Sequence, residues 1–290
     1  MNDYVGREVM EHDGRRAAFN ALAKKTFGLS FEAWYRDGYW TEKYMPYTLF
    51  DGARAVSNVS VNRLDVVYEG NTYLMYQLGT VMTDPEYRGQ GYAARLIRRI
   101  QEEYLESCDT MFLFANKNVL DFYPKFGFEK RIQYGFRLNC RNGAGRRERK
   151  LDMDQSSDRQ LLQKFYEKGN PFSVMQVVRN PELLMFYCMG PLRDCIRYIP
   201  GQDAVVIVEW EEGIPVIYDI YCDPGKNLQE ILSVAGAGKA GEARLKFTPL
   251  DSEHANLAAA EDPDNTLFIL KNESGIWDRK PLLFPEISHT

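Results

Sequence analysis

Hydrophobic side chains recur with a helical period in two parts of the first half of the chain. In residues 13–27 they fall three and four positions apart, and Gly28 follows as a stop signal. Residues 92–105 show the same period along one face. The pattern predicts an amphipathic helix at each place, and the aromatic-rich stretch 31–44 predicts a third helix close to the first.

Between these helices the pattern changes to that of strands. Residues 54–68 and 72–83 are rich in β-branched and aromatic side chains, and the sequence Glu-Gly-Asn at 69–71 separates them as a hairpin-type turn. Residues 111–115 form a short apolar run typical of a buried strand, and residues 119–126 are expected to form a short helix.

The rest of the chain repeats this order of elements without repeating the residues. Residues 128–138 and 146–153 can pair as strands around the turn at 142–145. We therefore predict an α/β (α+β) fold with a mixed, twisted sheet flanked by helices, in two tandem copies at residues 1–153 and 154–290. The later elements are expected as helices at 154–168, 181–189 and 227–235, a strand pair within 204–223, and strands at 242–249, 266–270 and 281–284.

Composition narrows the class of protein. The chain has 290 residues, of which 44% are hydrophobic, and it contains no run of about 18 apolar residues that could cross a membrane. Five cysteines without C-x-x-C spacing and three scattered histidines argue against a disulfide framework and against a metal centre. We expect a cytoplasmic protein with neither a metal nor a membrane partner, and the oligomeric state stays open.

Charge is distributed unevenly along the chain. Residues 1–150 carry 23 Lys and Arg against 19 Asp and Glu, whereas the remainder carries 13 against 22. The first half suits an anionic ligand and the second half a cationic one. Charged residues that only face solvent would produce the same difference. An overall charge of −5 and the lack of a basic aromatic stripe argue against nucleic acid as a partner.

The most informative segment leads from the strand at 72–83 into the helix at 92–105. It reads Arg-Gly-Gln-Gly-Tyr-Ala over residues 88–93. Glycines let a backbone approach a ligand closely, and the first amides of a helix have no acceptor within that helix. Such amides bind phosphate or pyrophosphate. The spacing fits neither a dinucleotide-binding loop nor a P-loop.

Two motifs in order resemble those of the GNAT superfamily of N-acetyltransferases. Arg88, Gly91 and Ala93 fill the defined positions of the pattern [QR]-x-x-G-x-[GA]. Asn116 and Tyr123, followed by Gly127-Phe128, fit that family's N-x(6)-Y-x(3)-G-F segment. The resemblance is concentrated between residues 73 and 131, and the corresponding turn at 222–227 lacks the phosphate-loop pattern.

The resemblance implies an acetyl-CoA-dependent N-acetyltransferase that moves the acetyl group directly to a primary amine on a small molecule or peptide. Backbone groups of Val81 and Thr83 would meet the pantetheine arm and the acetyl carbonyl, and Asn116 would bond the arm. Tyr123 would protonate the leaving thiolate, because a phenol with a pKa of about 10 carries its proton at neutral pH. The amides expected to hold the pyrophosphate are those of Gly89, Gly91, Tyr92 and Ala93, with Arg88 adding charge.

The general base does not carry over from the family. Gln77 occupies the strand position where some members place a glutamate, and an amide cannot accept a proton from an ammonium. Asp84, Glu69 and Glu86 are candidates that could act through water. A non-catalytic acyl-CoA sensor of the same fold is the alternative function.

Several residues have a second interpretation. Tyr123 could be a core tyrosine, and Arg88 could be a solvated arginine. The arginines at 95, 98 and 99 could meet the cofactor's 3′-phosphate or form a solvated helix face. The aromatic residues Trp34, Tyr35, Tyr39 and Trp40 could line an acceptor pocket or pack in the core.

Overall fold

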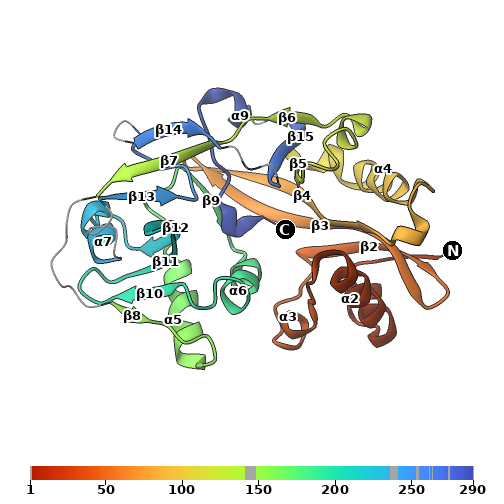
Figure 1. Cartoon of the computed structure of the whole chain (residues 1–290), viewed down its shortest axis with the longest axis horizontal. Coiled ribbons are helices and arrows are strands. Elements are labelled where there is room, and N and C mark those ends of the chain that lie inside the picture. Colours follow the sequence, from red (N-terminus) through yellow and green to blue (C-terminus); the bar gives the residue numbers. More distant parts are fainter. Residues whose placement is uncertain are drawn as a thin grey trace.

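The computed structural model describes residues 2–140, 148–235, 241–252, 255–260, 262, 264–273 and 275–289. Within them the chain forms two mixed sheets flanked by helices, as the hydrophobic pattern predicted (Figure 1). The helices are α1 (Arg7–Met10), α2 (Asp13–Phe27), α3 (Glu32–Arg36), α4 (Tyr92–Tyr104), α5 (Ser156–Tyr166), α6 (Pro181–Met189), α7 (Leu228–Val234) and α9 (Ile276–Arg279).

The first sheet has the strand order β1-β2-β3-β4-β5-β15-β6, and β9 pairs with residues 65–68 at the end of β3. All neighbours are antiparallel except β4 and β5, which α4 connects as a parallel crossover. The strands are β1 (Asn2–Val5), β2 (Tyr44–Asp51), β3 (Arg54–Tyr68), β4 (Asn71–Thr83), β5 (Thr110–Ala115), β6 (Glu129–Arg131), β9 (Met175–Val178) and β15 (Thr266–Asn272).

The second sheet repeats this arrangement with the order β14-β7-β13-β12-β11-β10-β8. Here β12 and β13 are the parallel pair, and α7 connects them as α4 connects β4 and β5. Two such sheets fit tandem copies of one fold. The strands are β7 (Tyr134–Asn139), β8 (Arg149–Lys150), β10 (Ile196–Ile199), β11 (Ala204–Glu211), β12 (Ile214–Cys222), β13 (Glu242–Leu245) and β14 (Ala255–Ala259).

The two sheets exchange strands. In the first sheet, the strand beside β5 is β15, which comes from the C-terminal part of the chain. In the second sheet, the strand beside β13 is β7, which comes from the N-terminal half. Sheet membership therefore crosses residue 153 in both directions, and the predicted division at 1–153 and 154–290 remains a prediction about folding units.

Helices cover both faces of the first sheet. Leu96, Ile97 and Ile100 of α4 pack on one face, against a core that includes Val59 and Val61 of β3. On the other face lie α2 and α3, and their apolar side chains join a second core cluster (Figure 1). Successive side chains of β3 point to these two covered faces in turn. Both sets are therefore buried, which accounts for the β-branched residues that predicted the strand.

Two predictions about elements were wrong. Residues 128–138 and 146–153 do not pair: β7 lies between β13 and β14, and β8 pairs with β10, while the turn at 142–145 lies outside the described residues. Residues 281–284 form no strand, because their backbone bonds partly to side chains, such as Leu283 N to Thr248 Oγ1 at 2.7 Å.

Two predicted helices are shorter than expected. Of residues 31–44 only Glu32–Arg36 is helical, since the chain turns at Gly38, which has a φ of 78°, before it enters β2. Of residues 119–126 only Tyr123–Phe126 is helical, as one 3₁₀ turn with Pro124 in it.

Candidate active site

A groove of about 1020 Å³ opens where β4 and β5 separate. The parallel pairing of these strands runs from Met75 to Leu78 on β4 and ends there. Beyond it, residues 79–83 of β4 continue along the groove while Phe114 and Ala115 form the facing wall. A strand edge that has lost its neighbour offers backbone N–H and C=O groups to a ligand.

A bulge directs this edge of β4. Thr80 has a φ of 47°, which is uncommon for a β-branched residue and is maintained only when its surroundings determine it. Asn58, fully buried on β3, donates from Nδ2 to the Thr80 carbonyl oxygen at 2.9 Å. The Tyr44 hydroxyl donates to Thr80 Oγ1 at 2.8 Å and accepts from Ser60 Oγ at 2.9 Å. The strained conformation is thus held by buried side chains of β2 and β3.

The loop at residues 88–93, which the sequence predicted to bind phosphate, has the backbone conformation that its glycines suggested. Gly89 and Gly91 both have a φ of 77°, in the left-handed region that favours glycine. The first amide of α4 with an intrahelical bond is that of Arg95, which donates to Gly91 O at 2.9 Å. The amides of Tyr92, Ala93 and Ala94 precede it, and Gly91 has no side chain to cap them. The positive end of α4 therefore faces the groove.

The corresponding helix of the second half begins differently. The N-cap of α7 is Asn227, and its side chain accepts a hydrogen bond from Glu230 N at 3.2 Å. One of the amides that α4 leaves open is therefore satisfied within α7. This is a local difference between the two otherwise similar crossovers.

Tyr123 lines the groove while its ring is packed in the core. It is 4% exposed and makes edge contacts with Phe122 and Phe128 and a tilted contact with Phe268 of β15. Burial raises the pKa of Tyr123 to about 12. The phenol is therefore protonated at neutral pH and can donate a proton. Core residue and groove residue are thus compatible descriptions of the same side chain.

The structure brings all nine sequence-predicted residues to this one groove. Arg88 is exposed, and its Nε donates to Thr83 O at 3.3 Å, which holds it over the end of β4. Asn116 is also exposed and accepts from Asn118 N at 3.0 Å in a local turn. The nine that line the groove are Val81, Thr83, Arg88, Gly89, Gly91, Tyr92, Ala93, Asn116 and Tyr123. Their chemical roles remain predictions.

The carboxylates considered as bases lie elsewhere. Glu69 pairs with Lys280 and Glu86 with Arg54, while Gln77 is fully buried; none of these lines the groove, and neither does Asp84. The carboxylate among the described lining residues is Asp264, which is exposed and comes just before β15. Sequence reasoning missed it because residue 264 is distant along the chain from every motif.

Other groove residues were missed for a similar reason. Thr26 and Phe27, at the end of α2, line the groove, and Phe27 is 44% exposed. Its position just before the predicted stop at Gly28 was visible in the sequence, but its exposure was not. Phe114 faces the groove from the end of β5.

The aromatic and arginine clusters lie outside the groove. Trp34 packs on Phe186 of α6 and donates from Nε1 to Glu182 O at 2.8 Å, so it belongs to the contact between the two halves. Arg95 and Arg99 form ion pairs with Asp3 rather than projecting freely. None of these residues lines the groove.

Asp84 fixes the turn between β4 and the loop. It is 3% exposed, and its carboxylate accepts hydrogen bonds from Lys25 of α2 at 3.0 Å and from Arg54 of β3 at 2.7 Å. It also accepts from Glu86 N at 3.2 Å. Burial by itself raises the pKa of Asp84, but the hydrogen bonds from Lys25 and Arg54 outweigh it and lower the pKa to about 2.

We expect Asp84→Asn to destabilise the protein by about 1–3 kcal/mol at pH 7. The substitution removes the buried negative charge that Lys25 and Arg54 share. Since the folded-state pKa is lowered, this stability is present above the unfolded value near 4 and is lost as pH falls toward 2. Urea unfolding at pH 7 and pH 3 measures the difference. Glu86→Gln, which removes an exposed partner of Arg54, should change stability little; an equal loss in both variants would contradict the role of Asp84.

No described helix is long and apolar enough to cross a membrane. Within the same residues, no cluster of three or more His, Cys, Asp or Glu side chains has the geometry to hold a metal ion. The five cysteines are buried and unpaired. Burial raises the pKa of Cys108 to about 11, which disfavours a reactive thiolate.

Comparison with known proteins points to one family. Residues 12–131 match the family model of the acetyltransferase (GNAT) domain. The uncharacterized N-acetyltransferase YjhQ of Escherichia coli K12 is 34% identical over 77 residues. That match spans 26% of this chain and 41% of the relative, so it covers less than half of that protein.

Solved structures resemble nearly the whole chain. A probable N-acyltransferase of Enterococcus faecalis V583 has a TM-score of 0.62 at 14% identity, over 94% of this chain and 73% of that one. A GCN5-related N-acetyltransferase of Kribbella flavida has a TM-score of 0.57 at 15% identity, with the same coverage. Eis1 of Mycobacterium abscessus has a TM-score of 0.56 at 14% identity, over 94% and 74%. At these identities the likeness establishes the fold.

Proposed function

We propose that this chain, whose residues 12–131 match the model of the acetyltransferase (GNAT) domain, transfers an acetyl group from acetyl-CoA directly to a primary amine. The observation that carries this proposal is the groove itself. It combines an unpaired strand edge, an uncapped helix N-terminus and a protonated tyrosine hydroxyl along one continuous wall.

The residues present fit acetyl-CoA by their chemistry. The amides of Gly89, Gly91, Tyr92 and Ala93 would hold the pyrophosphate, with Arg88 beside them. The backbone of Val81 and Thr83 and the side chain of Asn116 would hold the pantetheine arm. The loose end of β4 after Leu78 supplies the free backbone groups that this requires.

Acetyl-CoA, when bound, supplies an acetyl thioester, and the chain supplies orientation and protons. Backbone amides of β4 near the bulge at Thr80 would donate to the oxygen on which negative charge develops. Tyr123 would give its proton to the departing sulfur. Asp264 is the described carboxylate on the groove wall that can accept a proton from the incoming ammonium.

The test is thioester consumption with a panel of primary amines, with free thiol measured as product. We expect amine-dependent thiol release that Asp264→Asn slows most below the pKa of the amine, where the substrate is charged. A protein that binds acetyl-CoA but releases no thiol with any amine would favour a non-catalytic acyl-CoA sensor instead.

A further inference from the structure

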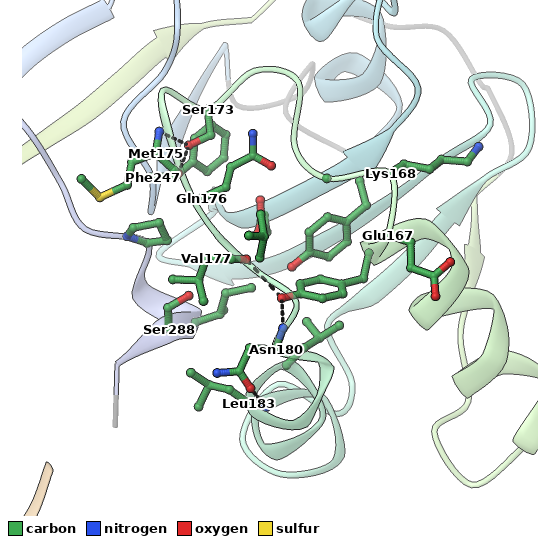
Figure 2. A pocket seen from close by; sticks show the side chains of 18 residues that line it. Glu167, Lys168, Ser173, Met175, Gln176, Val177, Asn180, Leu183, Phe247 and Ser288 are labelled. Atoms are coloured by element: carbon green, nitrogen blue, oxygen red, sulfur yellow. Dashed lines mark hydrogen bonds between the residues drawn. The ribbon is translucent and has the colours of Figure 1, made fainter. Parts of the chain in front are cut away.

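A second cavity, of about 180 Å³, lies between the two sheets, and its lining residues are all different from those of the groove. Its size is similar to that of a cavity of about 150 Å³ that holds benzene. The walls come from the end of α5, from β9, from the start of α6, from β12 and from residues 285–288 near the C-terminus (Figure 2). It can therefore enclose only a small molecule.

Asp219 of β12 contributes a carboxylate to this cavity. Its Oδ1 accepts from Asn170 Nδ2 at 2.6 Å and from Ile220 N at 2.9 Å. Asn170 is itself 1% exposed, and its backbone N–H donates to Gln176 Oε1, so the side chain that holds the carboxylate is fixed in place. Among the described residues no cation pairs with Asp219, and the Tyr221 hydroxyl is a further hydrogen-bond partner of its carboxylate.

The neighbouring charges do not compensate Asp219. Lys168 is the cation on the cavity wall, and its Nζ is already bonded to Asp203 at 3.1 Å and Asp223 at 2.7 Å. Figure 2 shows the side chains of Glu167 and Lys168 pointing away from Val177 and Ser173 and out of the cavity. The interior therefore carries a carboxylate without a counter-ion.

Two tyrosines stand beside this carboxylate. The rings of Tyr166 and Tyr221 meet edge to face, with centroids 5.5 Å apart. The Tyr166 hydroxyl donates to Val177 O at 3.1 Å and accepts from Asn180 N at 3.0 Å, as drawn in Figure 2. The Tyr221 side chain is 2% exposed, and its hydroxyl lies next to the Asp219 carboxylate.

An uncompensated carboxylate in such a place is costly, because burial removes water without supplying a counter-charge. Burial raises the pKa of Asp219 to about 6, so the group is still mostly ionised at pH 7. A ligand with an ammonium group would remove this cost.

We propose that this cavity binds a small molecule with a single ammonium group, which pairs with the Asp219 carboxylate and lies against the two tyrosine rings. An ammonium supplies the counter-charge that this carboxylate lacks, and aromatic faces attract cations. An anionic ligand of the same size would be repelled by Asp219. The inference does not rest on acetyl transfer, because it concerns a separate cavity.

The test is calorimetric titration of the full chain at pH 7 with propylammonium, in the absence of acetyl-CoA. Propanol and propionate serve as neutral and anionic probes of similar size. We expect saturable binding of one propylammonium per chain and at least tenfold weaker binding of the other two, because a charge-assisted hydrogen bond is lost. Failure here would leave the proposed acetyl transfer untouched.

Matched variants locate the binding. Asp219→Asn keeps the shape of the side chain and should weaken propylammonium binding at least tenfold, and Tyr221→Phe should weaken it severalfold with the fold intact by circular dichroism. Glu167→Gln removes an exposed carboxylate that points outward and should leave the affinity unchanged. The proposal is overturned if no saturable binding occurs up to roughly 50 mM, if propanol binds as well, or if Asp219→Asn and Tyr221→Phe both bind like the parent.

Discussion

Replacing Tyr123 with phenylalanine is expected to lower kcat by about 100-fold or more while the affinity for acetyl-CoA changes little. The substitution removes one hydroxyl and leaves the ring contacts with Phe122, Phe128 and Phe268 in place. Because burial raises the pKa of this phenol to about 12, the proton is present at every pH at which the protein is assayed. Steady-state rates and calorimetric CoA binding measure the two effects separately.

Tyr76→Phe is the matched control for this variant. Tyr76 belongs to the same core cluster and is 7% exposed, but it does not line the groove. Loss of its hydroxyl should therefore leave kcat near that of the parent. If Tyr123→Phe retained full kcat, or if both variants lost activity equally, Tyr123 would be only a core residue.

Gly91→Val is expected to weaken CoA binding at least tenfold. A β-branched residue is strongly disfavoured at a φ of 77°, and its side chain would stand where the phosphates must approach the first amides of α4. No atom lies within 4 Å of the position that a Cβ would take, so the protein itself has room for it. Calorimetry with CoA, supported by circular dichroism, measures the loss.

The matched control is Gly52→Val in the hairpin between β2 and β3. Gly52 also has a positive φ, 58°, with open space around it, and it lies outside the groove. It should show a comparable loss of stability with normal CoA affinity.

The parent should bind one CoA per chain, since Asn227 caps the helix in the second half that corresponds to α4. A Gly91→Val protein that binds CoA normally would remove the loop assignment, and two CoA per chain would contradict a degenerate second copy.

The local elements and the cofactor-type loop were predictable because their signals are local. The helix at 13–27 and the strand at 54–68 match α2 and β3 at both ends, since helical and strand periods are visible in a single segment. The loop could be predicted because Gly89 and Gly91 precede an amphipathic helix directly. The Asn116-to-Tyr123 spacing likewise lies within one short stretch.

The partners of each strand were not predictable in the same way. The apolar run at 266–270 indicated a strand, but nothing in it indicated pairing with β5, more than 150 residues earlier in the chain. A period of two identifies a strand and its buried face without identifying its neighbour. For this reason the exchange of β7 and β15 between the sheets was missed, and with it the contact of Phe268 with Tyr123.

The sequence by itself determined the class of elements, their order, the repeated arrangement and the motif that carries the family resemblance. Only the tertiary structure decided that Asp264 stands on the groove wall, that Asn58 holds the bulge at Thr80, and that Asp219 lines a second cavity. Each of these depends on segments that meet only after the sheets form. Contacts between distant segments arise from packing and burial, whereas periodicity and motif spacing are properties of neighbouring residues.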